Sequence, residues 1–273
     1  MKTCVLIPTY NNEGTILQVV RDVRQYVKDI IIVNDGSTDN TGDLLASLTS
    51  QPSVTVVSYK KNRGKGYALV KGFRTAMRKG FTHVITIDAD GQHFASDIPA
   101  LLSTMRDNPE GIIVGNRNLN EKNMPRGNTF ANKFSNFWFR LQTGINLPDT
   151  QSGFRLYSLS SIKGLGLITS RYEAELELLV FAAWSGARIT SVPVRVYYPP
   201  AEERVSHFRP FYDFARISVL NVFLCIGALV CRPWRQTIRH CFIRLPPRRK
   251  SAVCGGRLFR HCFIRLPPRR KSA

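Results

Sequence analysis

The sequence predicts an α/β protein with a Rossmann-like, mostly parallel sheet flanked by helices. Three observations indicate this fold class. Short apolar runs that suit buried strands alternate with segments whose apolar residues recur at helical spacing. Several of these runs end in clusters of Asn, Asp, Gly and Ser, which suits strand ends that open on a crevice. The chain has 273 residues, 43% of them hydrophobic, enough for one large domain with an ordinary core.

Five strands are expected in the first 115 residues. They lie at Thr3–Pro8, Ile30–Val33, Val54–Ser58, His83–Asp88 and Ile112–Gly115. The helical stripes between them include Ile16, Val20, Val23 and Val27 after Thr15, a candidate cap, and Leu101 with Met105 on a helix that begins near Asp97. Because strands that alternate with helices pair in parallel through crossovers, residues 1–115 are expected to form a nucleotide-binding half.

The second half of the chain has a different pattern of polar, aromatic and apolar residues. Residues 116–128 are polar and contain Pro125 and Gly127, which predicts a long loop. An aromatic helix should follow, with Phe130, Phe134, Phe137, Trp138 and Leu141. After it we expect a turn-rich segment at Asp149–Arg155, a helix around Glu173–Trp184 and a strand pair near Ile189–Val196.

Residues 208–231 predict an amphipathic or apolar helix that associates with a membrane. The nearly uncharged part, Ile217–Cys231, has 15 residues, fewer than the roughly 20 that a spanning helix needs. Extended back to Phe208, the segment gains aromatic residues, Arg209 and Arg216, which suits a helix lying in the membrane interface. A buried core helix or a dimerisation surface is the alternative.

The net charge of +20 is concentrated in the last 42 residues. Residues 232–273 hold 13 Lys and Arg and no acid, so 26 basic and 19 acidic residues leave +7 for residues 1–231. The 14 residues RHCFIRLPPRRKSA at 239–252 recur at 260–273. We expect this basic tail to be disordered and to suit an anionic membrane surface. No nucleic-acid-binding motif accompanies the charge, so nucleic acid is not an expected partner.

The six cysteines favour a reducing compartment. No Cys-x-x-Cys pair occurs, and only Cys4 lies in the expected core, which argues against a disulfide framework and a zinc site. The first strand follows the N-terminus directly, without the pattern of a secretory signal. A cytosolic location is therefore expected.

The most informative motif is the pair Asp88 and Asp90, at the end of the apolar run that begins at Val84. On an extended backbone, residues i and i+2 point the same way, so both carboxylates can reach one hard cation. The pair is followed by Gly91 and Gln92. This arrangement predicts a site for Mg²⁺ or Mn²⁺ that can hold a diphosphate leaving group.

Other expected strand ends carry polar loops that should open on the same edge of the sheet. The first ends in PTYNNE (residues 8–13), and the second in NDGSTD (residues 34–39). Asp35 is therefore placed to accept hydrogen bonds from a nucleobase or ribose, although the same residues also favour a turn and a helix cap. A basic glycine-rich turn, NRGKG, spans residues 62–66. The chain has neither a Walker P-loop nor a G-x-G-x-x-G fingerprint, so neither an ATPase nor a nicotinamide enzyme is indicated.

Six motifs resemble, in their order and spacing, those of glycosyltransferase family 2. They are PTYNNE, NDGSTD, NRGKG, DADGQ, GNR and SGFR. The chain is most similar to the polyprenyl-phosphate (dolichol-phosphate) hexosyltransferases, over roughly residues 2–214. The resemblance implies a GT-A fold over residues 1–207, with an acceptor half at about 116–207. It also implies inverting transfer from a nucleotide sugar, with Mg²⁺ or Mn²⁺ as cofactor.

The resemblance also implies roles for particular residues. Pro8, Tyr10, Glu13 and Asp35 would line the nucleoside pocket, and Lys65 is a further substrate-binding candidate. Asp88, Asp90 and Gln92 would hold the metal and the donor diphosphate. Arg117 would contact a phosphate and, with Asp90, is the catalytic candidate, while Arg126 matches a second phosphate-binding arginine. Ser152 and Arg155 fall near the acceptor side, and Asn116 stands where the family commonly has serine.

Acid strength helps to choose the acceptor. A sugar hydroxyl is a poor nucleophile near neutral pH and needs a carboxylate as general base. A phosphate monoester, with a second pKa of about 6, is already largely dianionic, and it needs arginines and metal to screen its charge. The chain offers Arg117, Arg126 and Arg155 for screening, and Glu173, Glu175 and Glu177 as bases. Since Glu173 and Glu177 share a helix face, at least one of them can be a solvated surface residue. A phosphate acceptor is favoured.

The sequence therefore predicts transfer of a hexose from a GDP-mannose or UDP-glucose type donor to a polyprenyl phosphate. The enzyme would work at the cytoplasmic face of the cell membrane, as a peripheral or weakly anchored protein. Transfer to a saccharide hydroxyl in cell-surface polysaccharide synthesis is the first alternative. A nonenzymatic membrane- or nucleic-acid-binding protein is the second, and a nucleotidyltransferase on a related fold is remote.

Overall fold

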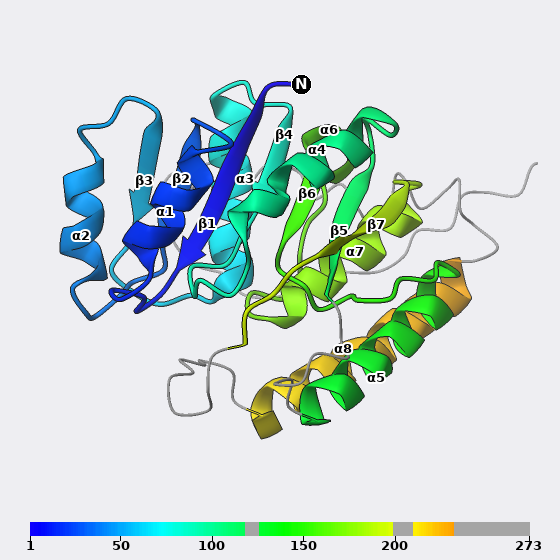
Figure 1. The fold of residues 1–273 in the computed structure, drawn as a ribbon. Coiled ribbons are helices and arrows are strands. Elements are labelled where there is room, and N and C mark those ends of the chain that lie inside the picture. The colour runs from blue at the N-terminus through cyan, green and yellow to red at the C-terminus, as the bar shows by residue number, and fades with distance from the viewer. Residues whose placement is uncertain (118–125, 199–209, 232–273) are drawn as a thin grey trace, which may run out of the picture.

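The computed structural model describes residues 1–117, 126–198 and 210–231, with side chains for residues 1–117, 131–198 and 215–228. In this part of the chain, seven strands form one sheet in the order β3-β2-β1-β4-β6-β5-β7 (Figure 1). The strands are β1 (Thr3–Thr9), β2 (Ile30–Asn34), β3 (Val54–Ser58), β4 (His83–Thr86), β5 (Ile112–Arg117), β6 (Arg155–Ser158) and β7 (Ile189–Val194). Only β6 runs antiparallel to its two neighbours, so the predicted mostly parallel sheet is confirmed.

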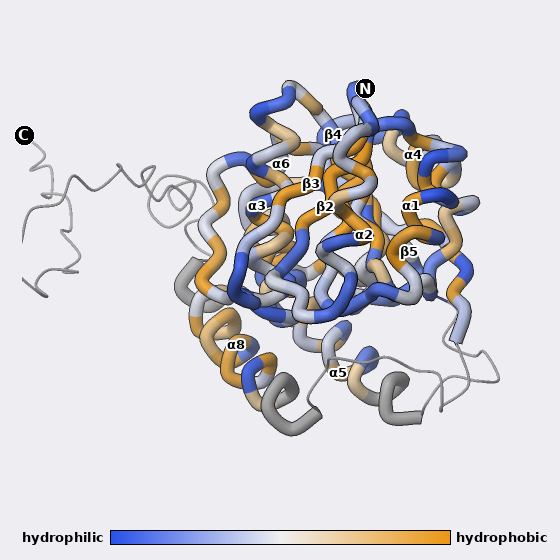
Figure 2. The backbone as a smooth tube through the Cα atoms, turned by 90° about the vertical axis from the view of Figure 1, so that its left-hand side faces the viewer, coloured by the Kyte–Doolittle hydropathy of each residue, from blue (hydrophilic) through white to orange (hydrophobic). Residues whose placement is uncertain are grey.

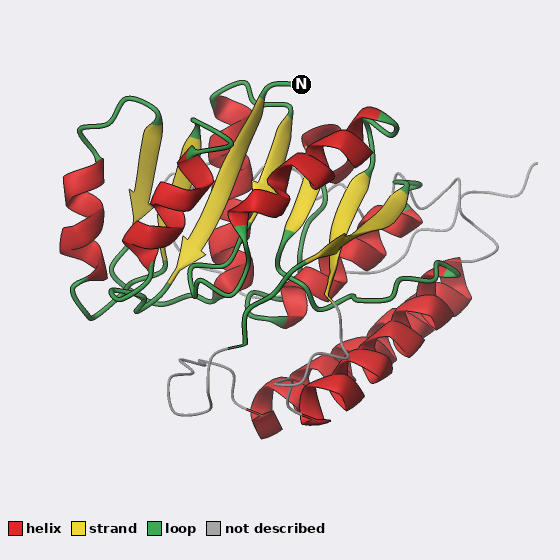
Figure 3. Ribbon diagram, viewed as in Figure 1, coloured by secondary structure: helices red, strands yellow, loops and turns green. Residues whose placement is uncertain are grey.

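Helices lie on both faces of this sheet (Figure 3). They are α1 (Ile16–Arg24), α2 (Thr41–Leu48), α3 (Lys65–Arg78), η1 (Ala95–Asp97), α4 (Ile98–Arg106), α5 (Arg126–Thr143), α6 (Leu159–Ile162), α7 (Glu173–Trp184) and α8 (Pro210–Cys231). Side chains alternate along β1, so Leu6 joins a core with α3 and α7, whereas Val5 and Ile7 join a core with α1 and α4. Both faces of the sheet are therefore covered by apolar packing against helices.

Four local predictions need correction. The strand expected at residues 83–88 ends at Thr86, and Thr15 does not cap α1, because its hydroxyl donates to the Ala89 carbonyl at 2.6 Å. The strand pair near residues 189–196 is one strand, β7, plus a single bridge between Val196 and His93. The long loop expected at 116–128 is shorter, since β5 runs through Arg117 and α5 begins at Arg126.

The strand that sequence reasoning missed is β6. Its sequence RLYS is short and begins with an arginine, so it has none of the apolar alternation that marks a strand. It nonetheless lies between β4 and β5 with all four residues buried. Long-range packing therefore decides this element.

The C-terminal helix is confirmed from Pro210 onward, while Phe208, Arg209 and the basic tail at 232–273 lie outside the described residues. Helix α8 packs against α5 and α7, and Figure 2 shows that most of it is apolar. Leu220 and Leu224 join the core, but Val222 and Phe223 are exposed, so α8 is not the buried core helix named as an alternative. None of the described helices combines the length and apolar character needed to cross a bilayer.

Candidate active site

The polar loops at the carboxyl edge of the sheet enclose an open cleft of about 1010 Å³. It brings together most of the predicted site residues from segments far apart in sequence. The predicted residues that line it are Pro8, Tyr10, Asp35, Lys65, Asp88, Asp90, Gln92 and Arg117. Glu13, Ser152 and Arg155 do not line it, and the side chain of Arg126 lies outside the described residues.

Asp88 and Asp90 follow β4 and both face this cleft, as predicted. The Asp88 carboxylate lies against Gly153, where a Cβ atom would come within 2.4 Å of Asp88 Oδ2, so this position requires glycine. Burial raises the pKa of Asp90 to about 6, and the like charge of Asp88 adds to the effect. Burial alone would also raise the pKa of Asp88, but the nearby charges of Lys65, His93 and Arg117 together outweigh it and lower that pKa below its ordinary value.

Lys65 compensates two of the acids in the cleft. Its Nζ lies 2.7 Å from Asp88 Oδ1 and 2.9 Å from Glu175 Oε2. Burial would lower the pKa of Lys65, but these two carboxylates raise it, so the ammonium stays charged. Lys65 reaches them because α3 approaches the first turn of α7 closely at Gly66, where a Cβ atom would lie 2.3 Å from Ala174 Cβ.

The donor atoms around Asp90 fit a hard divalent cation. Carboxylate and amide oxygens are the ligands that Mg²⁺ and Mn²⁺ prefer, and two like charges in one buried cleft are relieved by a cation. Within the described residues, no group of three or more His, Cys, Asp or Glu could hold a metal alone. A cation here would therefore need Asp88, Asp90 and Gln92 together with water or substrate phosphate oxygens.

At the other end of the cleft, Asp35 stabilises the glycine-rich turn. Its carboxylate is buried and accepts hydrogen bonds from the backbone N–H of Arg63 at 2.7 Å and of Gly64 at 2.8 Å. Asp39 accepts from the backbone N–H of Thr41, the first residue of α2, at 3.0 Å, although the capping residue Asn40 forms no side-chain cap bond. Glu13 was predicted to line the nucleoside pocket, but it does not line the cleft, and its carboxylate instead accepts from the backbone N–H of Asn40 at 2.9 Å.

Arg117, at the end of β5, pairs with Asp149. The prediction that Arg155 binds substrate needs correction. The Arg155 guanidinium is fully buried and donates to the carbonyl oxygens of Ser152, Thr150 and Glu175, at 2.6, 2.8 and 2.9 Å. It therefore joins β6 to α7 and is not exposed to a substrate. Ser152 is also fully buried, and its hydroxyl accepts from the backbone N–H of Phe154.

The three glutamates of α7 are all buried, so the expectation of a solvated one is wrong. Glu177 accepts from the backbone N–H of Ile168 at 2.6 Å and of Thr169 at 2.9 Å. Glu173 Oε1 accepts from Arg216 Nε of α8 at 2.9 Å, and its Oε2 has no hydrogen-bond partner among the described residues. Glu173 and Glu175 both line the cleft, but Glu175 pairs with Lys65, so the unpartnered Glu173 Oε2 atom is the candidate base of α7.

Sequence reasoning missed several residues that matter to the cleft. Lys61 and Arg171 line it and add positive charge beside Lys65 and Arg117. Arg171 stands alone between two polar segments, so no pattern marks it. Asp149 opens the motif that was interpreted as a turn, and its pairing with Arg117, 32 residues earlier, has no sequence signal.

This fold and this cleft define a glycosyltransferase of the GT-A class. Residues 4–166 match the family model described as Glycosyl transferase family 2, and the chain belongs to that family. The predicted family and fold are thereby confirmed, and the nonenzymatic alternative is set aside.

Two relatives have names that describe transfer to lipid phosphates. The UDP-N-acetylglucosamine–dolichyl-phosphate N-acetylglucosaminyltransferase of Methanococcus voltae is 32% identical over 213 residues, covering 71% of this chain and 85% of the relative. The undecaprenyl-phosphate mannosyltransferase of Micrococcus luteus is 29% identical over 203 residues, covering 71% of this chain and 83% of the relative.

The fold is also that of a solved enzyme. Glucosyl-3-phosphoglycerate synthase from Mycobacterium tuberculosis, in complex with Mn²⁺, UDP-glucose and phosphoglyceric acid, superimposes with a TM-score of 0.58 at 19% identity. The match covers 83% of this chain and 79% of the synthase. At this identity the likeness supports the fold alone.

Proposed function

We propose that the protein transfers a hexose from a nucleotide sugar to a polyprenyl phosphate, with inversion at the anomeric carbon and with Mg²⁺ or Mn²⁺ as cofactor. The donor would be of the GDP-mannose or UDP-glucose type. The observation that carries the proposal is the charge of the cleft, where Arg117, Lys65, Lys61 and Arg171 meet the predicted metal ligands. Such a cleft suits two phosphate groups that must approach each other.

The reaction follows from these charges. The acceptor phosphate is already largely dianionic at neutral pH, so its oxygen can attack the anomeric carbon without a base. The C–O bond to the donor diphosphate breaks, and that bond pair leaves with the diphosphate. A cation held by Asp88, Asp90 and Gln92 would supply charge stabilisation for this leaving group. Arg117 and Lys65 would orient the phosphates and screen their repulsion.

Relatives support the acceptor and the donor class. Both curated relatives above carry names that describe transfer to dolichyl or undecaprenyl phosphate. The solved neighbour holds Mn²⁺ with UDP-glucose in the same fold.

The first experiment is a transfer assay with labelled GDP-mannose or UDP-glucose, short-chain polyprenyl phosphate, and Mn²⁺ or Mg²⁺. We expect label in the lipid fraction that is lost when EDTA is added. If the folded protein binds nucleotide sugar but labels no lipid with either donor, the lipid-phosphate acceptor is wrong.

The unpartnered Oε2 atom of Glu173 favours one alternative acceptor, a saccharide hydroxyl. A buried carboxylate oxygen at the cleft can deprotonate a saccharide hydroxyl. If that alternative holds, a soluble sugar acceptor is labelled, and Glu173→Gln abolishes the labelling. Transfer to lipid phosphate is expected to survive the same substitution.

We further propose that α8 and α5 bind the cytoplasmic face of the membrane. Val219, Val222, Phe223 and Ile226 share one face of α8 and are each more than half exposed, with Phe223 at 68%. Phe137 and Leu141 of the neighbouring helix α5 are exposed as well. An apolar helix face that is followed in the sequence by a basic segment suits an anionic lipid surface.

We expect Phe223→Asp to weaken binding to vesicles of phosphatidylglycerol and phosphatidylcholine about tenfold or more, because one large apolar side chain is lost from the interface. Cosedimentation with the vesicles measures this change. Tyr26→Asp, an exposed aromatic after α1, is the matched control and should bind like wild type. Unchanged binding of Phe223→Asp would contradict the proposal, and a loss of dimers in light scattering would assign this face to self-association.

A further inference from the structure

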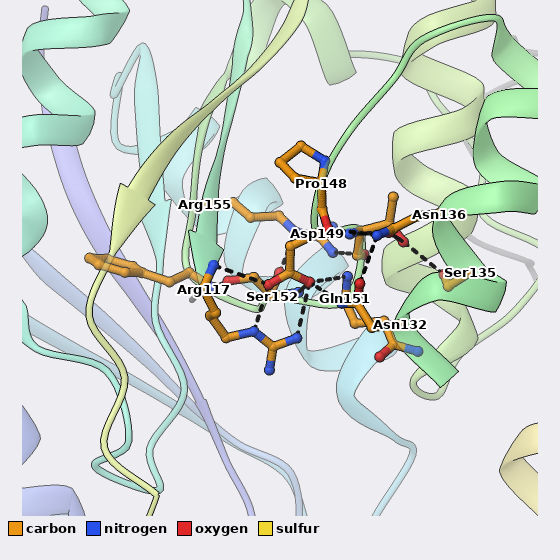
Figure 4. A network of polar contacts seen from close by, with 11 residues as sticks. Arg117, Asn132, Ser135, Asn136, Pro148, Asp149, Gln151, Ser152 and Arg155 are labelled. Carbon is orange, nitrogen blue, oxygen red and sulfur yellow. Dashed lines mark hydrogen bonds and ion pairs between the residues drawn. The ribbon is translucent and has the colours of Figure 1, made fainter. Parts of the chain in front are cut away.

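Asp149 is a buried carboxylate that receives six hydrogen bonds, more than any simple turn requires. Its Oδ2 accepts from Arg117 Nε at 2.6 Å and from the Arg117 backbone N–H at 3.3 Å. Its Oδ1 accepts from Arg117 Nη2, Asn132 Nδ2 and the backbone N–H groups of Gln151 and Ser152, at 3.0, 2.6, 3.0 and 3.2 Å. Figure 4 shows the carboxylate at the centre of this network.

These contacts keep Asp149 ionised although it is fully buried. Burial alone would raise the pKa of Asp149, but the hydrogen bonds and charge of Arg117 outweigh it and lower that pKa. The pair is therefore a charge-assisted fork in which both partners stay charged. Such a fork fixes the plane of the guanidinium as well as its position.

The fork leaves part of Arg117 available to the cleft. Asp149 engages Nε and Nη2, and the third guanidinium nitrogen points away from the carboxylate (Figure 4). The Arg117 side chain is 17% exposed and lines the cleft. A planar guanidinium held in this way can bind a phosphate with its free edge.

Helix α5 holds the carboxylate from the other side. Asn132 is fully buried and its amide donates to Asp149, while Asn136 donates to Asn132 Oδ1 at 2.7 Å and to the Pro148 carbonyl at 2.6 Å. Asn136 in turn accepts from the backbone N–H of Thr150 at 2.9 Å. The orientation of Asp149, and through it that of Arg117, therefore depends on α5.

We propose that Asp149 is a positioning residue, which holds Arg117 in the orientation that binds the acceptor phosphate, with Asn132 holding Asp149 in turn. This inference rests on the proposed lipid-phosphate acceptor. An effect of the Asp149 charge and an effect of Arg117 positioning predict opposite changes in phosphate binding when Asp149 is replaced. Because Asp149 is negative, removing its charge would strengthen anion binding if charge alone mattered, whereas loss of the fork weakens binding if position matters.

The test compares Asp149→Asn, Arg117→Ala and the double variant in the transfer assay. We expect Asp149→Asn to lower kcat/KM for polyprenyl phosphate about a hundredfold, the size of loss that a misplaced catalytic contact causes. The Kd of the nucleotide sugar should stay unchanged. If Asp149 acts through Arg117, the double variant is no worse than Arg117→Ala, but if its role is only structural, the two losses multiply.

The chain contains a matched control in Asp97. Its carboxylate also pairs with an arginine, Arg195: Oδ1 accepts from Nε at 3.0 Å and from Nη2 at 2.6 Å, and Oδ2 accepts from the Arg195 backbone N–H at 2.6 Å. This pair does not line the cleft, so Asp97→Asn should leave transfer unchanged.

Each outcome has a distinct meaning. A wild-type enzyme that labels no lipid overturns the proposed function, whereas an active wild type with a fully active Asp149→Asn variant overturns the positioning role alone. Multiplicative losses in the double variant also overturn it. If Asp149→Asn does not fold, Asn132→Ala replaces it in the same cycle with Arg117→Ala, with a loss of about tenfold expected and full activity counting against the inference.

Discussion

Replacing Asp90 with alanine is expected to lower the rate of sugar transfer about a thousandfold without lowering the melting temperature. The catalytic loss follows from the predicted role of Asp90 in holding the cation that stabilises the departing diphosphate. The stability expectation follows from its surroundings. Burial and the like charge of Asp88 raise the pKa of Asp90 to about 6, so its ionisation costs stability as the pH rises above the ordinary value of 3.8, and the full cost is present above about 6. Removing the carboxylate relieves this cost at pH 7.

The measurement is transfer to polyprenyl phosphate across a Mn²⁺ titration, together with thermal unfolding without metal. Asp107→Ala, which removes an exposed carboxylate at the end of α4, is the control and should match wild type. Near-normal transfer by Asp90→Ala would remove Asp90 from the metal site. A large drop in melting temperature would instead make it a structural residue.

The sequence predicted the parallel part of the sheet because that part is local. Each of β1, β2 and β3 is a short run rich in apolar residues, and the composition of β1 and β2 predicts the burial that the structure shows for them. Strand β6 begins with Arg155, whose acceptors are carbonyl oxygens from Thr150, Ser152 and Glu175. Only the folded chain brings those oxygens to one point, so a residue that resembled a substrate contact became a strand-to-helix link.

For the candidate site as well, the sequence predicted the residues in local motifs but not the contacts between distant segments. Residues such as Asp88 and Lys65 follow motifs in strand-end loops, and the parallel sheet brings those loops to one edge. What could not be predicted are the pairings, such as Arg117 with Asp149 and Lys65 with Glu175, because they join segments separated by 32 and 110 residues. The glutamates of α7 illustrate the consequence, since spacing showed their shared face but not the partners that bury them.

The second large effect is expected for Lys65→Met, which should destabilise the protein by about 3–5 kcal/mol and lower transfer at least about a hundredfold. Lys65 is 18% exposed and is within ion-pair distance of both Asp88 and Glu175. Without the ammonium, two carboxylates in a largely buried cleft lose their common partner. The donor diphosphate would also lose one of the cations that line the cleft.

A double variant separates these two roles of Lys65. In Lys65→Met with Glu175→Gln, one of the uncompensated charges is gone, so the free energy of unfolding in urea should recover in part. Transfer should remain low, because the cation that faces the donor phosphates is still missing. Lys60→Met, an exposed lysine after β3, is the control and should keep both stability and activity. If the double variant regains activity along with stability, Lys65 serves only to compensate the acids, and the phosphates depend on Arg117, Lys61 and Arg171 instead.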